Sequence, residues 1–312
     1  MSTAPVPHSR ISGTGITFAV ASYVLWGFLP LLFLSLAPTG AVEIVSWRIV
    51  LSLVFCAFLL TVTRGWGRFA ALVRDRTAII TLSIAAVFIL VNWSVFIYAT
   101  MSGHIVEASL GYFTNPIVTV LLGVVVLRER LRPLQWVAIG VSACAVLTLA
   151  IGYGAFPWIS LALAFSFGLY GLAKKQVGGR ADAIGGLTVE TAVLSPFAVL
   201  ALALLGPTLT IGTISPLHTV LLLSVGAATA TPLILFAAAA RRIPLIYLGL
   251  VQYLSPIMQL VIGVALLHEP MPLGRWLGFG IVWIALAILT TDMVLAARRS
   301  RGDATVEVSA AP

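Results

Sequence analysis

Long apolar runs separated by short polar breaks repeat along almost the whole chain. A helix needs about 20 consecutive apolar residues to cross the hydrocarbon core of a bilayer. The breaks are rich in Pro, Gly and Ser, which favour turns, as in APTGA, LRP, GAFP and RRIP. The pattern therefore predicts ten membrane-spanning helices, at residues 14–36, 42–62, 78–100, 105–127, 134–151, 157–174, 184–206, 217–240, 245–267 and 274–296.

The amino-acid composition agrees with this pattern. Of the 312 residues, 60% are hydrophobic and only 9% are charged. Soluble domains carry about 25% charged residues, so a soluble fold could not bury this much apolar surface. We expect an all-α integral membrane protein with two five-helix repeats, 14–151 and 157–296, a cytoplasmic N-terminal tail, 1–13, and a disordered cytoplasmic C-terminal tail, 297–312.

The positive charges are distributed unevenly between the predicted loops. If the N-terminus is cytoplasmic, all but two of the 18 Lys and Arg residues fall in the N-terminal tail, the cytoplasmic loops or the C-terminal tail. The exceptions are Arg48, within a span, and Arg275, on the opposite side. Because cytoplasmic loops of membrane proteins are enriched in these residues, both termini are expected inside. Topology then explains the net charge of +8, and nucleic acid is not an expected partner.

The two halves of the chain resemble each other at a shift of 140 residues. Five spans are an odd number, so the second half should enter the membrane with the opposite orientation, as in many secondary transporters. The loop at 128–133 is rich in Arg, whereas its twin at 268–273 has none, as expected for loops on opposite sides. The glutamate kept in both loops is expected to close the turn locally. The matching pairs are Pro116 and Pro256, Gly123 and Gly263, Glu129 and Glu269, Trp136 and Trp276, and Gly140 and Gly280.

Pro116 and Pro256 interrupt two predicted spans at matching positions. Each proline removes a backbone donor within the membrane, and paired interruptions of this kind indicate a binding site near the midplane. Polar and aromatic residues of this region are candidates for lining a substrate path, although they could equally hold helices together, and core packing is the favoured role of Trp93. These candidates are Asn92, Trp93, Ser109, Tyr112, Asn115, Thr231, Gln252 and Tyr253.

Among the ionisable residues within the predicted spans, we weigh four as functional candidates, since intramembrane ionisable groups are such candidates by default. Arg48 needs a carboxylate partner, for which Glu107 and Glu190 are the alternatives. Arg48 and Glu190 are expected to line a polar cavity. Glu43 and Glu107 are better explained as structural or interfacial charges, but all three carboxylates are candidates for proton coupling.

The sequence contains no motif for covalent or metal-dependent catalysis or for ATP binding. The two cysteines have no metal-ligand spacing, so neither a cofactor nor a metal is expected. Transport would then be driven by a gradient, and a membrane-embedded enzyme is the less favoured alternative. The small-xxx-small pattern GRWLG at 274–278 is compatible with a homodimer.

Several short stretches carry a family resemblance. They resemble the drug/metabolite transporter superfamily with EamA-type repeats, and in particular its RarD branch, often labelled chloramphenicol-sensitive protein. The resemblance implies a ten-helix permease of the bacterial inner membrane that moves small metabolites or drugs, by export or, alternatively, by import or exchange. The stretches are YVLWGFLPL (23–31), EIVSWRIVLS (43–52), NWSVFIYA (92–99), EASLGYFTNP (107–116), RER (128–130), SFGLYGLAKK (166–175) and GLVQYLSP (249–256).

Overall fold

The fold is taken from a computed structural model, in which every regular element of the described residues is a helix. The chain divides into two compact units, described separately below. Unit 1 holds residues 1–83 and 177–259, and unit 2 holds residues 84–176 and 260–312. The predicted N-terminal tail and Glu129 lie outside the described residues, apart from Gly13. The residues described are 13–128, 131–153, 156–240, 242–243, 248 and 250–309.

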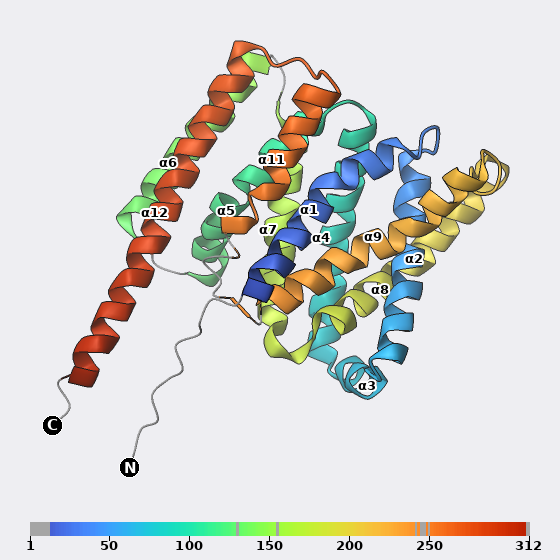
Figure 1. The fold of residues 1–312 in the computed structure, drawn as a ribbon, viewed down its shortest axis with the longest axis horizontal. Coiled ribbons are helices and arrows are strands. Elements are labelled where there is room, and N and C mark those ends of the chain that lie inside the picture. Colours follow the sequence, from blue (N-terminus) through green and yellow to red (C-terminus); the bar gives the residue numbers. More distant parts are fainter. Residues whose placement is uncertain are drawn as a thin grey trace. The chain divides into compact units, whose positions relative to one another are not determined.

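Unit 1 is built around α2 and its two neighbours, α8 and α9 (Figure 1). Helix α9 also packs against α1. At Gly226 of α9 the two backbones meet, because a Cβ built there would lie 2.5 Å from the backbone carbon of Leu51 in α2. Only glycine allows this approach. The helices of unit 1 are α1 (Gly13–Leu34), α2 (Ala41–Val62), α3 (Trp66–Arg74), α8 (Ala183–Leu205), α9 (Pro216–Ala240) and most of α11 (Leu254–Val261), with the 3-10 helices η1 (Gly178–Arg180) and η2 (Gly206–Thr208).

Unit 2 contains α6 and α12 side by side over much of their length (Figure 1). Helix α5 contacts α6, α12 and the π-helix η3. Phe113 of α5 packs edge-on against Phe279 and Trp283 of α12, with ring centres 6.1 and 6.2 Å apart. The helices of unit 2 are most of α4 (Arg76–Met101), α5 (Ile105–Leu127), α6 (Pro133–Tyr153), α7 (Trp158–Val177), η3 (Ile262–Leu266) and α12 (Leu273–Ser309).

Seven of the described helices are long and apolar enough to cross a membrane. Two shorter apolar helices, Pro133–Thr148 and Leu254–Leu266, accompany them. Large apolar side chains on these helices stay exposed, among them Phe58, Phe197 and Leu204. Exposed apolar surface on this scale requires lipid as solvent, so the chain is a multi-pass membrane protein. The count of ten spans stays a prediction.

The structure differs from the sequence prediction at three elements. The short helix α3 occupies part of the predicted loop between the second and third spans. The predicted span 245–267 contains α11 followed by a π-helix, η3. Helix α12 continues to Ser309, where a disordered tail was predicted from residue 297. The loss of apolar character marks where a span leaves the membrane but does not stop a helix, and residues 297–309 contain no proline.

Candidate substrate site

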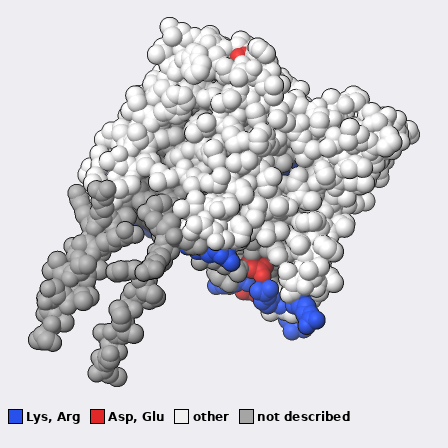
Figure 2. Space-filling model, in the orientation of Figure 1, with Lys and Arg blue, Asp and Glu red and all other residues white. Residues whose placement is uncertain are grey.

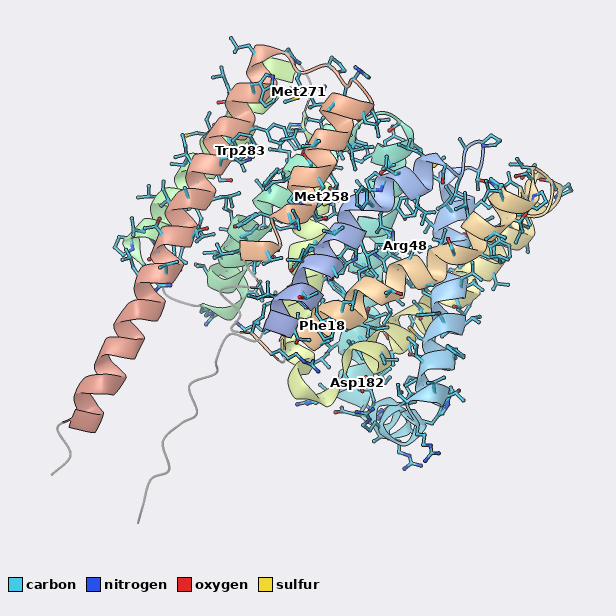
Figure 3. The ribbon with its side chains drawn as sticks, viewed as in Figure 1. Phe18, Arg48, Asp182, Met258, Met271 and Trp283 are labelled. Carbon is cyan, nitrogen blue, oxygen red and sulfur yellow. The ribbon has the colours of Figure 1, made fainter. Side chains whose placement is uncertain are left out.

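Arg48 and Glu190 lie within unit 1 on helices that pack together, α2 and α8. Their side chains are only 3% and 0% exposed. The guanidinium carbon of Arg48 lies 5.5 Å from the ring centre of Phe33 in α1. Glu190 lies within electrostatic range of Cys56 on α2. Figure 3 shows Arg48 within the length of α2, away from the helix ends. The two ionisable residues are thus buried on neighbouring helices of one unit, and the polar cavity that they were predicted to line stays a prediction.

Glu43, at the start of α2, is bound to the backbone of a loop. Its carboxylate accepts two hydrogen bonds from the backbone N–H of Thr210, at 2.9 and 3.1 Å. A third comes from the indole N–H of Trp47, at 3.3 Å. The neighbouring Thr39 hydroxyl lies 2.6 Å from that of Thr210 and 2.8 Å from Nε2 of His218. These contacts fasten the loop before α9 to α2, which fits the structural interpretation of Glu43.

Glu269 binds the N-terminus of α5 in unit 2. Its two oxygens accept hydrogen bonds from the backbone N–H groups of Ile105 and Val106, at 2.7 and 2.9 Å. The first N–H groups of a helix have no partner within the helix, so a carboxylate there satisfies them. The sequence predicted only that Glu269 closes its own turn, and this prediction missed its contact with α5. It reaches a helix that begins 164 residues earlier in the chain.

Glu107, in the first turn of α5, is buried beside the start of α7. The Ser160 hydroxyl of α7 donates to the backbone oxygen of Glu107 at 2.6 Å. Its Oε1 is buried without a hydrogen-bond partner among the described residues. Glu107 belongs to unit 2, whereas Arg48 belongs to unit 1.

Asn92 and Tyr112 meet in unit 2, as their inclusion in one predicted path requires. The amide nitrogen of Asn92 donates to the backbone oxygen of Leu163 and to the Ser166 hydroxyl, both at 3.2 Å. Its amide oxygen accepts from the hydroxyl of Tyr112 at 3.1 Å. The Asn92 amide therefore connects α4 to α7 through its nitrogen and to α5 through its oxygen. Trp93, beside it, is only 6% exposed, which is compatible with core packing.

The residues around the two prolines fall in separate units. Pro116 lies inside α5 of unit 2, with Ser109 and Asn115 on the same helix. Ser109 donates to the backbone oxygen of Val106, and Oδ1 of Asn115 is buried without a partner among the described residues. Pro256 lies in α11 of unit 1. Thr231, Gln252 and Tyr253 also belong to unit 1 and are half-buried.

An aromatic cluster of unit 1 was absent from the sequence-based candidates. Tyr23 and Trp26 of α1 and Phe236 of α9 have ring centres 5.3–6.2 Å apart. The hydroxyl of Ser22 next to them donates to the backbone oxygen of Pro232 at 2.7 Å. Tyr23 and Trp26 stand in the stretch YVLWGFLPL, so the sequence did contain a hint of this cluster. Aromatic residues in a span, however, are more often lipid-facing or core residues than ligand contacts.

Contacts recur in the two units at positions that the predicted repeat makes equivalent. The shift between equivalent positions is 140 residues, except around LWGF (25–28) and SFGL (166–169), where it is 141. Ser22 is joined to Pro232 in unit 1, and their equivalents Leu163 and Asn92 are joined in unit 2. A Cβ on Gly27 would lie 2.7 Å from the sulfur of Met258. A Cβ on the equivalent Gly168 would lie 3.0 Å from Val118, the equivalent of Met258.

The backbone matches in the same way after α5 and after η3. Arg128 and His268 occupy equivalent positions and are left-handed, with φ of 55° and 54°. Positive φ is uncommon outside glycine, so its recurrence at one repeat position is a specific likeness.

Comparisons with known proteins agree with this architecture. The EamA-like transporter family matches residues 13–151. Protein RarD of Streptomyces exfoliatus is 46% identical over 296 residues, which cover 92% of this chain and 91% of that protein. The uncharacterized transporter YojE of Bacillus subtilis is 39% identical over 92% of this chain and 97% of its own length. Protein RarD of Escherichia coli is 35% identical, with the same coverages.

A solved structure described only as a crystal structure of protein shares the fold. It has a TM-score of 0.59 and 15% sequence identity, and the match covers 89% of this chain and 98% of that one. With relatives of this identity over nine-tenths of its length, the chain belongs to the EamA-type drug/metabolite transporters, in the RarD branch.

Proposed function

We propose that the chain is a secondary transporter of the bacterial inner membrane that exports small organic solutes, metabolites or drugs, by alternating access. In this proposal ten spans form two inverted five-helix repeats, and both termini are cytoplasmic. The observation that supports it most strongly is the recurrence of equivalent contacts in the two units. Ser22–Pro232 and Leu163–Asn92 join matching positions, as do Gly27–Met258 and Gly168–Val118. Two similar halves of opposite orientation provide two similar gates.

We propose substrate-contacting groups within each unit, taken separately. Arg48 and Glu190 supply charges that are shielded from lipid, and either can attract an oppositely charged group of a solute. Asn115 supplies a buried oxygen acceptor beside Pro116. Tyr112 and the cluster of Tyr23, Trp26 and Phe236 supply aromatic faces. Groups of these kinds suit small solutes that carry both polar and planar apolar parts.

Glu190 is the carboxylate that we propose for proton coupling. Glu43 already accepts hydrogen bonds from the backbone of Thr210, which attach a loop, and one from Trp47 of its own helix. Glu107 lies at the end of its helix, beside the start of α7. Glu190 is fully buried within α8, where gain and loss of a proton would change the charge of the unit interior most.

The first test compares the metabolites in the medium of cells with and without the protein. Export predicts a solute that accumulates outside only when the protein is present. Depletion of a solute from the medium would instead favour import on the same fold. A medium that does not differ under any imposed gradient would contradict transport of small organic solutes.

The second test measures flux of that solute in proteoliposomes. Arg48→Ala and Glu190→Gln should each reduce flux by roughly tenfold, since losing one charge-assisted hydrogen bond costs about 1.5–3 kcal/mol. Arg64→Gln removes an exposed charge from a loop and is the matched control. Equal flux in all three variants, each correctly inserted, would remove Arg48 and Glu190 from the site.

A further inference from the structure

A pocket of about 350 Å³ lies at one end of unit 1, away from the candidate substrate site. It forms where α2 ends and where α4 and α8 begin, with α3 beside it. These helix ends mark the edge of three candidate membrane spans, Ala41–Val62, Arg76–Met101 and Ala183–Thr208. The pocket is therefore at the depth of lipid headgroups. Its lining includes Leu60, Arg68, Phe69, Asp75, Arg180 and Asp182.

The two carboxylates of the pocket hold the two guanidinium groups in place. Oδ1 of Asp182 accepts from the backbone N–H of Gly185 at 2.7 Å, and its Oδ2 lies 3.5 Å from Nη1 of Arg68. Oδ1 of Asp75 accepts from the N–H of Ala78 at 3.1 Å, and its Oδ2 lies 3.6 Å from Nη1 of Arg180. Each carboxylate thus caps a helix with one oxygen and orients an arginine with the other.

The surroundings of the pocket are positive even though its own charged side chains balance. The N-termini of α4 and α8 meet there, each capped by one of the two carboxylates. Each arginine has five N–H donors, and the ion pair engages the nitrogen Nη1. Arg64, Arg74 and Arg76 are exposed close by in the sequence. Figure 2 shows Lys and Arg gathered at the end of the unit where α3 lies, and Figure 3 shows Asp182 there.

The surface beside the pocket is apolar. Trp66 and Val73, seven residues apart on α3, share one helical face and are 46% and 48% exposed. Phe69, whose ring contacts that of Trp66, and Leu72 pack into the cluster around Ala78 and Val189. The exposed face continues the lipid-facing surface of α2, where Phe58 and Val62 are also exposed. A ligand of the pocket therefore has acyl-chain surface next to it.

We propose that this pocket binds the phosphate headgroup of an anionic phospholipid, with the acyl chains lying along α2 and the exposed face of α3. Arg68 and Arg180 contact the phosphate, and the exposed Arg64, Arg74 and Arg76 nearby in the sequence add to the attraction. Trp66 sits at headgroup level, as tryptophans of the membrane interface do. In the orientation proposed above, the lipid belongs to the cytoplasmic leaflet. The inference concerns lipid binding and stands independently of which solute is transported.

The test is native mass spectrometry of the full chain in detergent, titrated with dioleoyl-phosphatidylglycerol, -phosphatidylethanolamine and -phosphatidylcholine. Phosphatidylglycerol should bind first and at least about fivefold more tightly than the two zwitterionic lipids, because each arginine contributes about 1 kcal/mol. Arg68→Gln with Arg180→Gln should weaken its binding by roughly twentyfold. The matched control, Arg128→Gln with Arg242→Gln, removes two described loop arginines that do not line the pocket.

A second variant guards against loss of folding in the first. Ala71→Trp fills the pocket without changing its charge and should also abolish the preference for phosphatidylglycerol. Equal binding of the three lipids by the wild-type protein would overturn the proposal. So would an equal loss of binding in the control, or retention of the preference in a folded Ala71→Trp variant. Displacement of the lipid by equimolar inorganic phosphate would assign the pocket to free phosphate and would also overturn it.

Discussion

At the scale of single residues, the carboxylates of this protein divide by position along their helices. Glu43, Asp75, Asp182 and Glu269 accept hydrogen bonds from backbone N–H groups at helix starts or loops. Glu190 instead lies within a helix, fully buried, like Arg48. Backbone groups in a membrane protein must be satisfied internally, so carboxylates of the first kind are explained by folding alone. Position therefore separates the structural acids from the candidates for transport.

Glu269 provides a residue-scale prediction. Glu269→Ala should lower the free energy of unfolding by about 1–3 kcal/mol, since two backbone donors lose a buried partner. Glu269→Gln should lose less, because one side-chain acceptor remains. The measurement is the thermal unfolding midpoint of the purified protein in detergent. His268→Asn changes the exposed neighbour to a residue that tolerates its left-handed backbone, and it should stay within about 0.5 kcal/mol of wild type. A Glu269→Ala midpoint equal to that of His268→Asn would contradict the capping role.

The sequence indicated several residue roles and missed others for a physical reason. A charged side chain is costly in lipid, so the position of Arg48 and Glu190 within predicted spans was enough to predict their burial. The hydrogen bond between Asn92 and Tyr112 joins two predicted candidates. The partner of Glu269 could not be predicted in this way, because it lies 164 residues away and is a backbone group without side-chain identity.

At the scale of elements, close helix contact depends on where a glycine faces a backbone. A Cβ on Gly226 would lie 2.5 Å from the carbonyl carbon of Leu51, which cannot rotate away. A Cβ on Gly140 in α6 would meet nothing within 4 Å. Both glycines lie in apolar helices, so the sequence alone does not distinguish them. The same limit applies to α3 and η3, whose existence depends on tertiary packing around short segments rather than on span length.

These two glycines give an element-scale prediction. Gly226→Ala should destabilise the protein by about 1–3 kcal/mol, because α2 and α9 would have to move apart. Gly140→Ala should be neutral or stabilising by up to about 1 kcal/mol, since alanine favours the helix. Unfolding midpoints of both variants in the same detergent provide the comparison. Similar midpoints would show that α2 and α9 do not pack through Gly226.

At the scale of the whole molecule, the sequence predicts the membrane-spanning segments and the opposite orientation of the two halves. Measuring which loops are accessible from each side of the membrane tests that orientation. A background with Cys56 and Cys144 replaced should receive single cysteines at Leu131 or Met271, which occupy equivalent repeat positions. A membrane-impermeant thiol reagent applied to intact spheroplasts should label Met271→Cys, whereas Leu131→Cys should react only after the membrane is opened. Labelling of both from the same side would contradict opposite orientation of the two halves.

The hydrogen bonds and ion pairs that hold unit 1 together differ in their exposure to water. The bonds from Thr210 to Glu43 are buried with that carboxylate, while the pairs Arg68–Asp182 and Arg180–Asp75 join side chains that are 25–70% exposed. Dissolved ions screen exposed charges within a Debye length of about 8 Å at physiological strength and leave buried ones largely unaffected. A rise in salt would therefore loosen this unit from one end only. In the orientation proposed above, the potassium concentration of the cytoplasm would then act on the helix junction at α3 and leave the loop held by Glu43 unaffected.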